Sequence, residues 1–126
     1  MLDLVGRPSL IAVVEDDPSV RVAVQGVLKS AGFSVESFAS AEEFLASGQQ
    51  YDSACIITDL QMPGMSGLEL QERLNEDGSQ LPIIFISAFG DEQVRTRALK
   101  AGALDFLGKP FDDDVLIELV RTAVSA

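Results

Sequence analysis

Five short apolar runs, spread along the chain, constrain the fold of this sequence more than any other feature. Each run has four to six residues, and most are rich in valine, isoleucine or phenylalanine. That composition is typical of β-strands, and the length is too short for a helix. We therefore expect five strands. They occupy residues 10–14, 33–38, 54–58, 83–86 and 104–107.

Segments with helical periodicity alternate with these runs. In the first of them, apolar residues recur on one face between Val20 and Ala31. Asp17 and Pro18 supply a cap and a first turn, and Gly32 ends the helix. Asp17 therefore needs no chemical role.

Four further helices follow from similar signals. A serine followed three residues later by a glutamate, the capping-box spacing, occurs at 40–43 and again at 66–69, and Gly48 can end the former helix. A fourth helix is expected over about 91–101, and a fifth from 112 onward, where three aspartates favour a helix N-terminus. The side chains expected to face inward in these last two helices are Val94, Ala98, Leu99, Val115, Leu116, Leu119 and Val120.

Strict alternation of strands and helices implies parallel strands joined by right-handed crossovers, with helices on both faces of one sheet. The expected fold class is therefore α/β, with a doubly wound five-stranded parallel sheet. The second run is the most polar and suits an edge, whereas the other runs look buried on both faces. A chain of 126 residues has the size of one domain, 1–126, in which 1–8 form a loose lead-in.

The charged residues exclude several classes of chemistry. The chain has no histidine, which removes Ser–His–Asp and Cys–His catalysis and every zinc site that uses histidine. Nine lysines and arginines against 20 acids give a net charge of −11, which argues against direct binding of nucleic acid. A metal cation or a basic partner surface fits this charge better.

The single cysteine and the hydropathy pattern bear on location. Cys55 lies in an apolar run and cannot pair within the chain, so we expect a buried thiol, compatible with a reducing compartment. No apolar stretch approaches the length that spans a membrane, and the first residues lack the apolar region of a signal peptide. We therefore expect a cytoplasmic protein that does not contact a membrane.

Polar side chains gather where the strands of the expected sheet end. They are Glu15 and Asp16 after the first strand, Asp59 after the third, Ser87 after the fourth and Lys109 after the fifth. In an open doubly wound sheet, ligands bind beyond the carboxyl ends of the strands. Three carboxylates brought together there repel one another unless a cation offsets them, and Mg²⁺ is the simplest such cation. Ser87 and Lys109 suit phosphoryl oxygens, so this edge indicates phosphoryl chemistry with a carboxylate nucleophile.

Taken singly, each of these residues has a simpler interpretation. Asp59 can be a turn or cap residue, and Lys109 alone is a solvated cation. The hypothesis therefore depends on their combination at one edge of the sheet.

Four segments, in order along the chain, resemble the signature motifs of one family. They are Val-Val-Glu-Asp-Asp-Pro at 13–18, Ile-Thr-Asp-Leu-Gln-Met-Pro-Gly-Met-Ser-Gly at 57–67, Ile-Ser-Ala at 86–88 and Asp-Phe-Leu-Gly-Lys-Pro-Phe at 105–111. Over about 10–123, the chain resembles the receiver domain of two-component response regulators, in particular of the nitrogen-fixation regulator type. The resemblance implies a flavodoxin-like (βα)5 fold with the strand order 2-1-3-4-5.

The resemblance also implies roles for individual residues. Asp59 would accept a phosphoryl group from a phosphohistidine on a separate sensor histidine kinase. Mg²⁺ would be bound by Asp16, Asp59 and the backbone carbonyl of Gln61, with Glu15 acting through a metal-bound water. Two side chains would contact the phosphoryl oxygens, namely Ser87 and Lys109.

Further implications concern the fifth strand and the output. Phe106 would be an aromatic switch that turns inward as Ser87 moves toward the phosphoryl group, and the Lys109–Pro110 peptide bond would be cis. The surface of the fourth helix and fifth strand would then control an output domain or a partner in transcription regulation, including a phosphorylation-dependent dimer. The contact residues expected there are Thr96, Arg97 and Lys100. Such a domain is no enzyme beyond catalysing its own phosphorylation and dephosphorylation.

Two other functions stay open. One is a receiver-like module that binds a partner without being phosphorylated. The other is a metal-dependent phosphatase with an aspartate nucleophile, but such enzymes carry a second aspartate two residues on, where this chain has Gln61. Phe89 is bulky at a position that lines access to the family's phosphorylation site, so the dephosphorylation rate also stays open.

Overall fold

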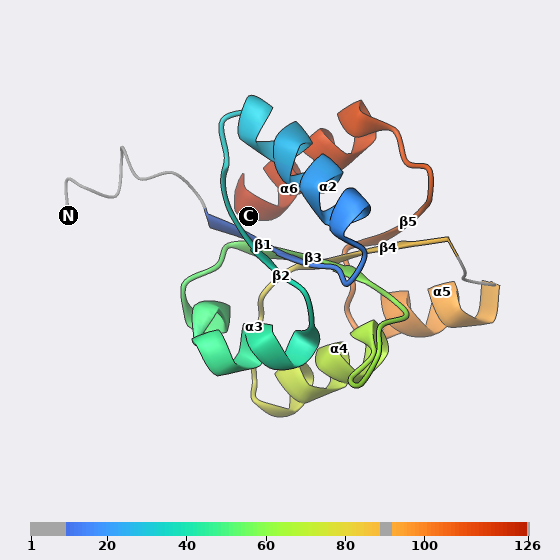
Figure 1. Cartoon of the computed structure of the whole chain (residues 1–126). Coiled ribbons are helices and arrows are strands. Elements are labelled where there is room, and N and C mark those ends of the chain that lie inside the picture. Colours follow the sequence, from blue (N-terminus) through green and yellow to red (C-terminus); the bar gives the residue numbers. More distant parts are fainter. Residues whose placement is uncertain (1–9, 89–91, 126) are drawn as a thin grey trace.

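The computed structural model describes residues 10–88 and 92–125, which form a five-stranded sheet covered by helices (Figure 1). The strand order is β2-β1-β3-β4-β5, and every neighbouring pair is parallel. The expected α/β class, the strand order and the edge position of the polar second strand are therefore confirmed. The strands are β1 (Leu10–Val14), β2 (Ser34–Phe38), β3 (Cys55–Asp59), β4 (Ile83–Ser87) and β5 (Asp105–Gly108).

The helices cover both faces of the sheet. In Figure 1, α2 and α6 lie on one face, and α3, α4 and α5 lie on the other, as a doubly wound sheet requires. Their bounds are α2 (Pro18–Ser30), α3 (Ala41–Ser47), α4 (Gly67–Glu76), α5 (Glu92–Lys100) and α6 (Asp113–Ser125), and a short 3₁₀ turn, η1 (Gln49–Tyr51), follows α3.

Alternate residues of the strands fill two separate cores. Ile11 and Val13 of β1 pack in the core that includes α2 and α6, whereas Ala12 and Val14 belong to the core that includes α3 and α4. All four side chains are fully buried. Because β1 and β3 are covered on both faces, the polar residues at their carboxyl ends are held on a rigid frame.

Side-chain caps fix where the helices begin and end. The side chain of Asp17 accepts a hydrogen bond at 2.9 Å from the amide two residues on and caps α2, as predicted. Ser66 and Glu69 form a complete capping box at the start of α4. Ser40 caps α3, and Gly48 ends it in the left-handed conformation, at a φ of 77°.

Some predictions for the last strand and the last helix are wrong. Leu104 precedes β5 and is 38% exposed, because β5 is the second edge of the sheet and is covered only in part. Val115 was expected to face inward but is 45% exposed. The buried stripe of α6 runs along Leu116, Val120 and Ala123, and Val115 lies to one side of it in the first turn. Leu116 and Val120 are buried as predicted.

Three predictions lie outside the described residues: the lead-in at 1–8, the start of the fourth helix at Asp91 and the access role of Phe89. Among the helices that the structure describes, none has both the length and the hydropathy needed to cross a membrane.

Candidate functional site

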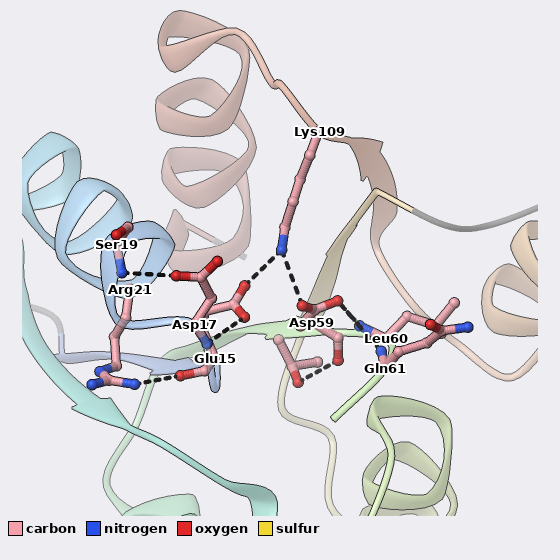
Figure 2. Close-up of polar contacts among 9 residues, drawn as sticks. Glu15, Asp17, Ser19, Arg21, Asp59, Leu60, Gln61 and Lys109 are labelled. Carbon is pink, nitrogen blue, oxygen red and sulfur yellow. Dashed lines mark hydrogen bonds and ion pairs between the residues drawn. The ribbon is translucent and has the colours of Figure 1, made fainter. Parts of the chain in front are cut away.

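The carboxyl ends of four strands bring the predicted site residues to one edge of the sheet. In the pairing register, Asp59 of β3 lies opposite Ile86 of β4, and Ser87 lies opposite Gly108 of β5. Figure 2 shows Glu15, Asp59 and Lys109 pointing toward one another from three different strand ends.

The turn after β1 is fixed on both sides of Glu15. The Glu15 N–H donates to the Phe38 carbonyl at 3.0 Å, and Arg21 Nη1 donates to the Glu15 carbonyl at 2.8 Å. Glu15 Oε2 accepts from the Asp17 amide at 3.1 Å, so the side chain is also held. Glu15 is fully buried, whereas Asp16, which follows it, is exposed.

Asp59 is the last residue of β3 and is 7% exposed. Its Oδ1 accepts hydrogen bonds from the amides of Leu60, at 2.6 Å, and Gln61, at 3.3 Å. A Cβ atom at Gly67 would overlap the carbonyl oxygen of Asp59, so the start of α4 approaches the strand end in a way that only glycine permits. These contacts hold the Asp59 carboxylate in one orientation and leave Oδ2 toward Lys109.

Lys109 joins the two buried acids. Its Nζ lies 2.9 Å from Glu15 Oε1 and 3.0 Å from Asp59 Oδ2, and its side chain is 18% exposed (Figure 2). The peptide bond between Lys109 and Pro110 is cis, as expected. The ammonium group thus bridges the carboxylates and offsets part of their mutual repulsion.

Burial changes the protonation of this cluster. Desolvation raises the pKa of Glu15 to about 7; the nearby Asp59 carboxylate adds to the rise, and Lys109 opposes it. For Lys109, desolvation lowers the pKa, but its hydrogen bonds to Glu15 and Asp59 outweigh that effect, so the net pKa is raised. The lysine therefore stays charged at neutral pH, while the Glu15 carboxyl titrates near it.

The acidic residues fit a divalent cation. One carboxylate oxygen each from Glu15, Asp16 and Asp59 lies within 4.8 Å of the others. An all-oxygen set of this kind suits a hard ion such as Mg²⁺, which binds one or two carboxylates and keeps several waters. The Gln61 amide contacts Asp59, but the use of the Gln61 carbonyl as a ligand stays a prediction.

Two further predicted residues lie on β4 and β5, Ser87 at the end of its strand and Phe106 opposite Phe85. Ser87 is 3% exposed at the end of β4. Phe106 is 5% exposed, and its ring lies 6.0 Å from that of Phe85. Phe106 is therefore packed inside in this structure, and its role as a switch stays a prediction.

Sequence reasoning missed two contacts near the site, and helical spacing could have found the first of them. Arg21 lies one turn after the Asp17 cap, so helical spacing alone could have placed it beside the acidic turn. Glu42 accepts a hydrogen bond from the Met65 amide, in the loop after β3. The capping-box spacing from Ser40 gives Glu43 a local role, but no pattern assigns a partner to Glu42, because the loop that Glu42 contacts lies 23 positions away.

Comparisons with known proteins agree with this geometry. Residues 11–121 match the sequence profile of the family described as response regulator receiver domain. The chain is 44% identical over 118 residues to the response regulator protein TodT of Pseudomonas putida, covering 94% of this chain and 52% of TodT. It is 42% identical over 114 residues to the transcriptional regulatory protein FixJ of Azorhizobium caulinodans, covering 90% and 54% of the two chains.

A solved receiver structure has the same fold as this chain. The crystal structure of FixJ-N superimposes with a TM-score of 0.84 at 38% identity, covering 94% of this chain and 95% of that one. The chain spans about half the length of the curated relatives it matches.

Proposed function

Because the chain belongs to the response regulator receiver domain family of two-component systems, we propose that it is a phosphoryl acceptor and that Asp59 receives the group. Receiver domains are signalling modules and not enzymes in the ordinary sense. The phosphoryl donor in this proposal is a phosphohistidine of a separate sensor kinase, as the resemblance to receiver domains implies. The exchange is proposed to take place in the cytoplasm.

The observation that carries this proposal is the bridge made by Lys109. A buried carboxylate needs a fixed orientation and a nearby positive charge to attack a phosphorus atom that carries negative oxygens. Asp59 has both, because two backbone amides hold its Oδ1 and the Lys109 ammonium lies 3.0 Å from its Oδ2.

The chemistry is an in-line displacement at phosphorus. An oxygen of the Asp59 carboxylate forms the new P–O bond as the P–N bond to the donor imidazole breaks, and the bonding electron pair returns to the imidazole nitrogen. Asp59 is fixed in place by its amide contacts, Lys109 supplies positive charge and Ser87, at the end of the adjacent strand, supplies a hydroxyl.

The proposed cofactor is Mg²⁺. Asp16, Asp59 and the Gln61 carbonyl would hold it, with Glu15 acting through a bound water, and it would supply positive charge to the phosphoryl oxygens. A cation there would also offset the charges of Glu15 and Asp59, so the Lys109 ammonium that now bridges them would be able to contact a phosphoryl oxygen.

A groove beside Lys109 is the proposed contact surface for the kinase. It has a volume of about 440 Å³ and lies between the start of α2 and the segment after β5. A donor that reaches Asp59 must approach the edge on which Lys109 lies. The groove is lined mainly by apolar groups, from Ser19, Val20, Ala23, Lys109, Pro110 and Phe111.

The proposed output surface is formed by α5 and β5. Arg95 of α5 donates from Nη1 to the Phe106 carbonyl at 3.2 Å, and its Nη2 lies 3.8 Å from Asp105 Oδ1, so the helix and the strand are linked. A change at Ser87 or Phe106 can therefore reach the exposed residues of α5. Those exposed residues include Thr96, Arg97 and Lys100.

The experiment uses acetyl phosphate and Mg²⁺ with intact-mass detection. Wild type is expected to gain the mass of one phosphoryl group, and Asp59→Asn is expected to gain none. Asp52→Asn, an exposed residue after η1, serves as the matched control and should behave as wild type. Phosphorylation of Asp59→Asn at the wild-type rate would refute the assignment. A wild type that gains no mass would favour the unphosphorylated module. Steady hydrolysis of an unactivated phosphate monoester, supplied in place of acetyl phosphate, would favour the phosphatase.

A further inference from the structure

The loop between Asp59 and α4 carries the predicted carbonyl ligand Gln61, so its conformation matters for cation binding. The loop is anchored at both ends. Leu60 and Met62 are buried in the core, and the Gly67 amide donates to the Leu60 carbonyl at 2.9 Å. Gln61 and Gly64 are exposed, and Ser66 is half-buried just before α4.

Glu42 ties this loop to a different helix. Its Oε2 accepts a hydrogen bond from the Met65 amide at 2.9 Å, across 23 positions of sequence. Glu42 lies in the first turn of α3 and is exposed, so the carboxylate packs against the loop from the outside.

Gly64, next to Met65, lies against the same carboxylate. Gly64 has a φ of 77°, and a Cβ atom there would lie 2.5 Å from Glu42 Oε2 and 3.4 Å from Oε1. A side chain at Gly64 would be strained by the backbone conformation and would push the flexible Glu42 carboxylate away from the Met65 amide. The contact between Glu42 and the loop therefore depends on glycine at position 64.

We propose that Glu42 is a positioning residue for the cation site, acting through the loop that follows Asp59. This inference rests on the proposed Mg²⁺ site. By holding the Met65 amide, Glu42 restricts the loop backbone before the cation arrives, and less conformational entropy is lost when the Gln61 carbonyl binds it. Glu42 does not touch the cation or the phosphoryl group. The positioning effect depends on the acceptor oxygen of Glu42 and not on its negative charge.

The test compares Mg²⁺ affinity by calorimetric titration of the metal-free protein in wild type, Glu42→Ala, Glu42→Gln and Glu43→Ala. Glu42→Ala removes the acceptor and should weaken binding about fivefold, the size expected if about 1 kcal/mol of loop ordering is no longer supplied before the cation binds. Glu42→Gln removes the charge but keeps an acceptor oxygen, so it should bind within about twofold of wild type. Glu43→Ala removes the same charge from the same helix turn and should also match wild type.

Amide hydrogen exchange of the metal-free protein provides a second readout. The Met65 amide should lose protection in Glu42→Ala and keep it in the other two variants, while urea unfolding of Glu42→Ala and Glu43→Ala should differ little. Equal Mg²⁺ affinity of Glu42→Ala and wild type would overturn the positioning role alone. Weak binding by both Glu42→Ala and Glu42→Gln would assign the effect to charge and overturn it as well. A wild type that binds no Mg²⁺ would overturn the proposed cation site together with this inference.

Discussion

Replacing Lys109 with methionine tests the electrostatics of the site most sharply. Lys109 bridges Glu15 and Asp59 at 2.9 and 3.0 Å, and Glu15 is fully buried. The substitution keeps most of the side-chain volume and leaves two acids facing each other without the cation. We expect metal-free Lys109→Met to be less stable than wild type, and more so at higher pH.

The size of the effect follows from the distances. At an effective dielectric constant of about 20, one ion pair at this separation has a Coulomb energy of about 6 kcal/mol, most of which is cancelled by desolvation. Removing one partner of a buried pair costs about 3–5 kcal/mol. Water reaches the partly exposed lysine, and Glu15 can take up a proton. We therefore expect Lys109→Met to lose about 2–3 kcal/mol of unfolding free energy at about pH 8.

The direction of the pH dependence follows from Glu15. Its pKa is raised from 4.5 to about 7 in the folded protein. A raised carboxyl pKa means that the folded state binds the extra proton, so this contribution to stability is full below the unfolded pKa and is lost as the pH rises through 7. Without Lys109 the pKa of Glu15 rises further, so the pH range over which stability is lost extends to higher pH. The difference between variant and wild type should therefore shrink to about 1 kcal/mol near pH 5.5.

The assay is urea unfolding followed by circular dichroism in the presence of a chelator, at both pH values. Lys100→Met, at an exposed position on α5, makes the same change in net charge and is expected to change stability little. A loss in Lys109→Met no larger than in Lys100→Met, or one that is equal at both pH values, would refute the electrostatic argument. Addition of Glu15→Gln to Lys109→Met should recover part of the stability at high pH, because it removes the buried charge.

Three further predictions concern the cation, the loop and the output surface. At a Mg²⁺ concentration about ten times the dissociation constant, binding contributes about 1.4 kcal/mol and should raise the wild-type melting temperature by about 5 °C. Asp16→Asn should show less than half of this shift, and a full shift in the variant would remove Asp16 from the cation site. Gly67→Ala should lower the free energy of unfolding in urea by about 1–3 kcal/mol, because its Cβ meets the Asp59 carbonyl and the Phe85 ring. Gly26→Ala in α2, with open space around it, should be neutral or stabilising by up to about 1 kcal/mol. Equal effects of the two substitutions would contradict the close approach of α4 to Asp59. Acetyl phosphate with Mg²⁺ should move the amide chemical shifts of 92–100 and 105–108 in wild type but not in Asp59→Asn, and changes confined to the loops around Asp59 would exclude this output surface.

The sheet and most of the site could be predicted from the sequence for a simple reason. Glu15, Asp59 and Lys109 each follow an apolar run, and parallel strands bring their carboxyl ends to one edge. Once the strands are identified, these residues must be neighbours. Their exact pairing, with Lys109 between the two acids, depends on side-chain directions that no local pattern encodes.

The parts that the sequence did not predict depend on tertiary contacts. Val115 fits the apolar period of the last helix, but its burial depends on how far the first turn of α6 overlaps the sheet. Glu43 has the capping-box spacing from Ser40, but the partner of Glu42 depends on the path of a loop 23 positions away. Leu104 belongs to an apolar run, but β5 lies at an edge, where part of a strand remains open to solvent.

The central claim is that Asp59 becomes an acyl phosphate, and reductive trapping tests it most directly. Borohydride reduces an acyl phosphate on aspartate to homoserine, and it leaves free carboxylates unchanged. After treatment with acetyl phosphate and Mg²⁺, tandem mass spectrometry of the reduced protein should find homoserine at position 59, and a sample without phosphodonor should contain none. Homoserine at position 16 or elsewhere, or none in a sample that has gained the phosphoryl mass, would contradict the account.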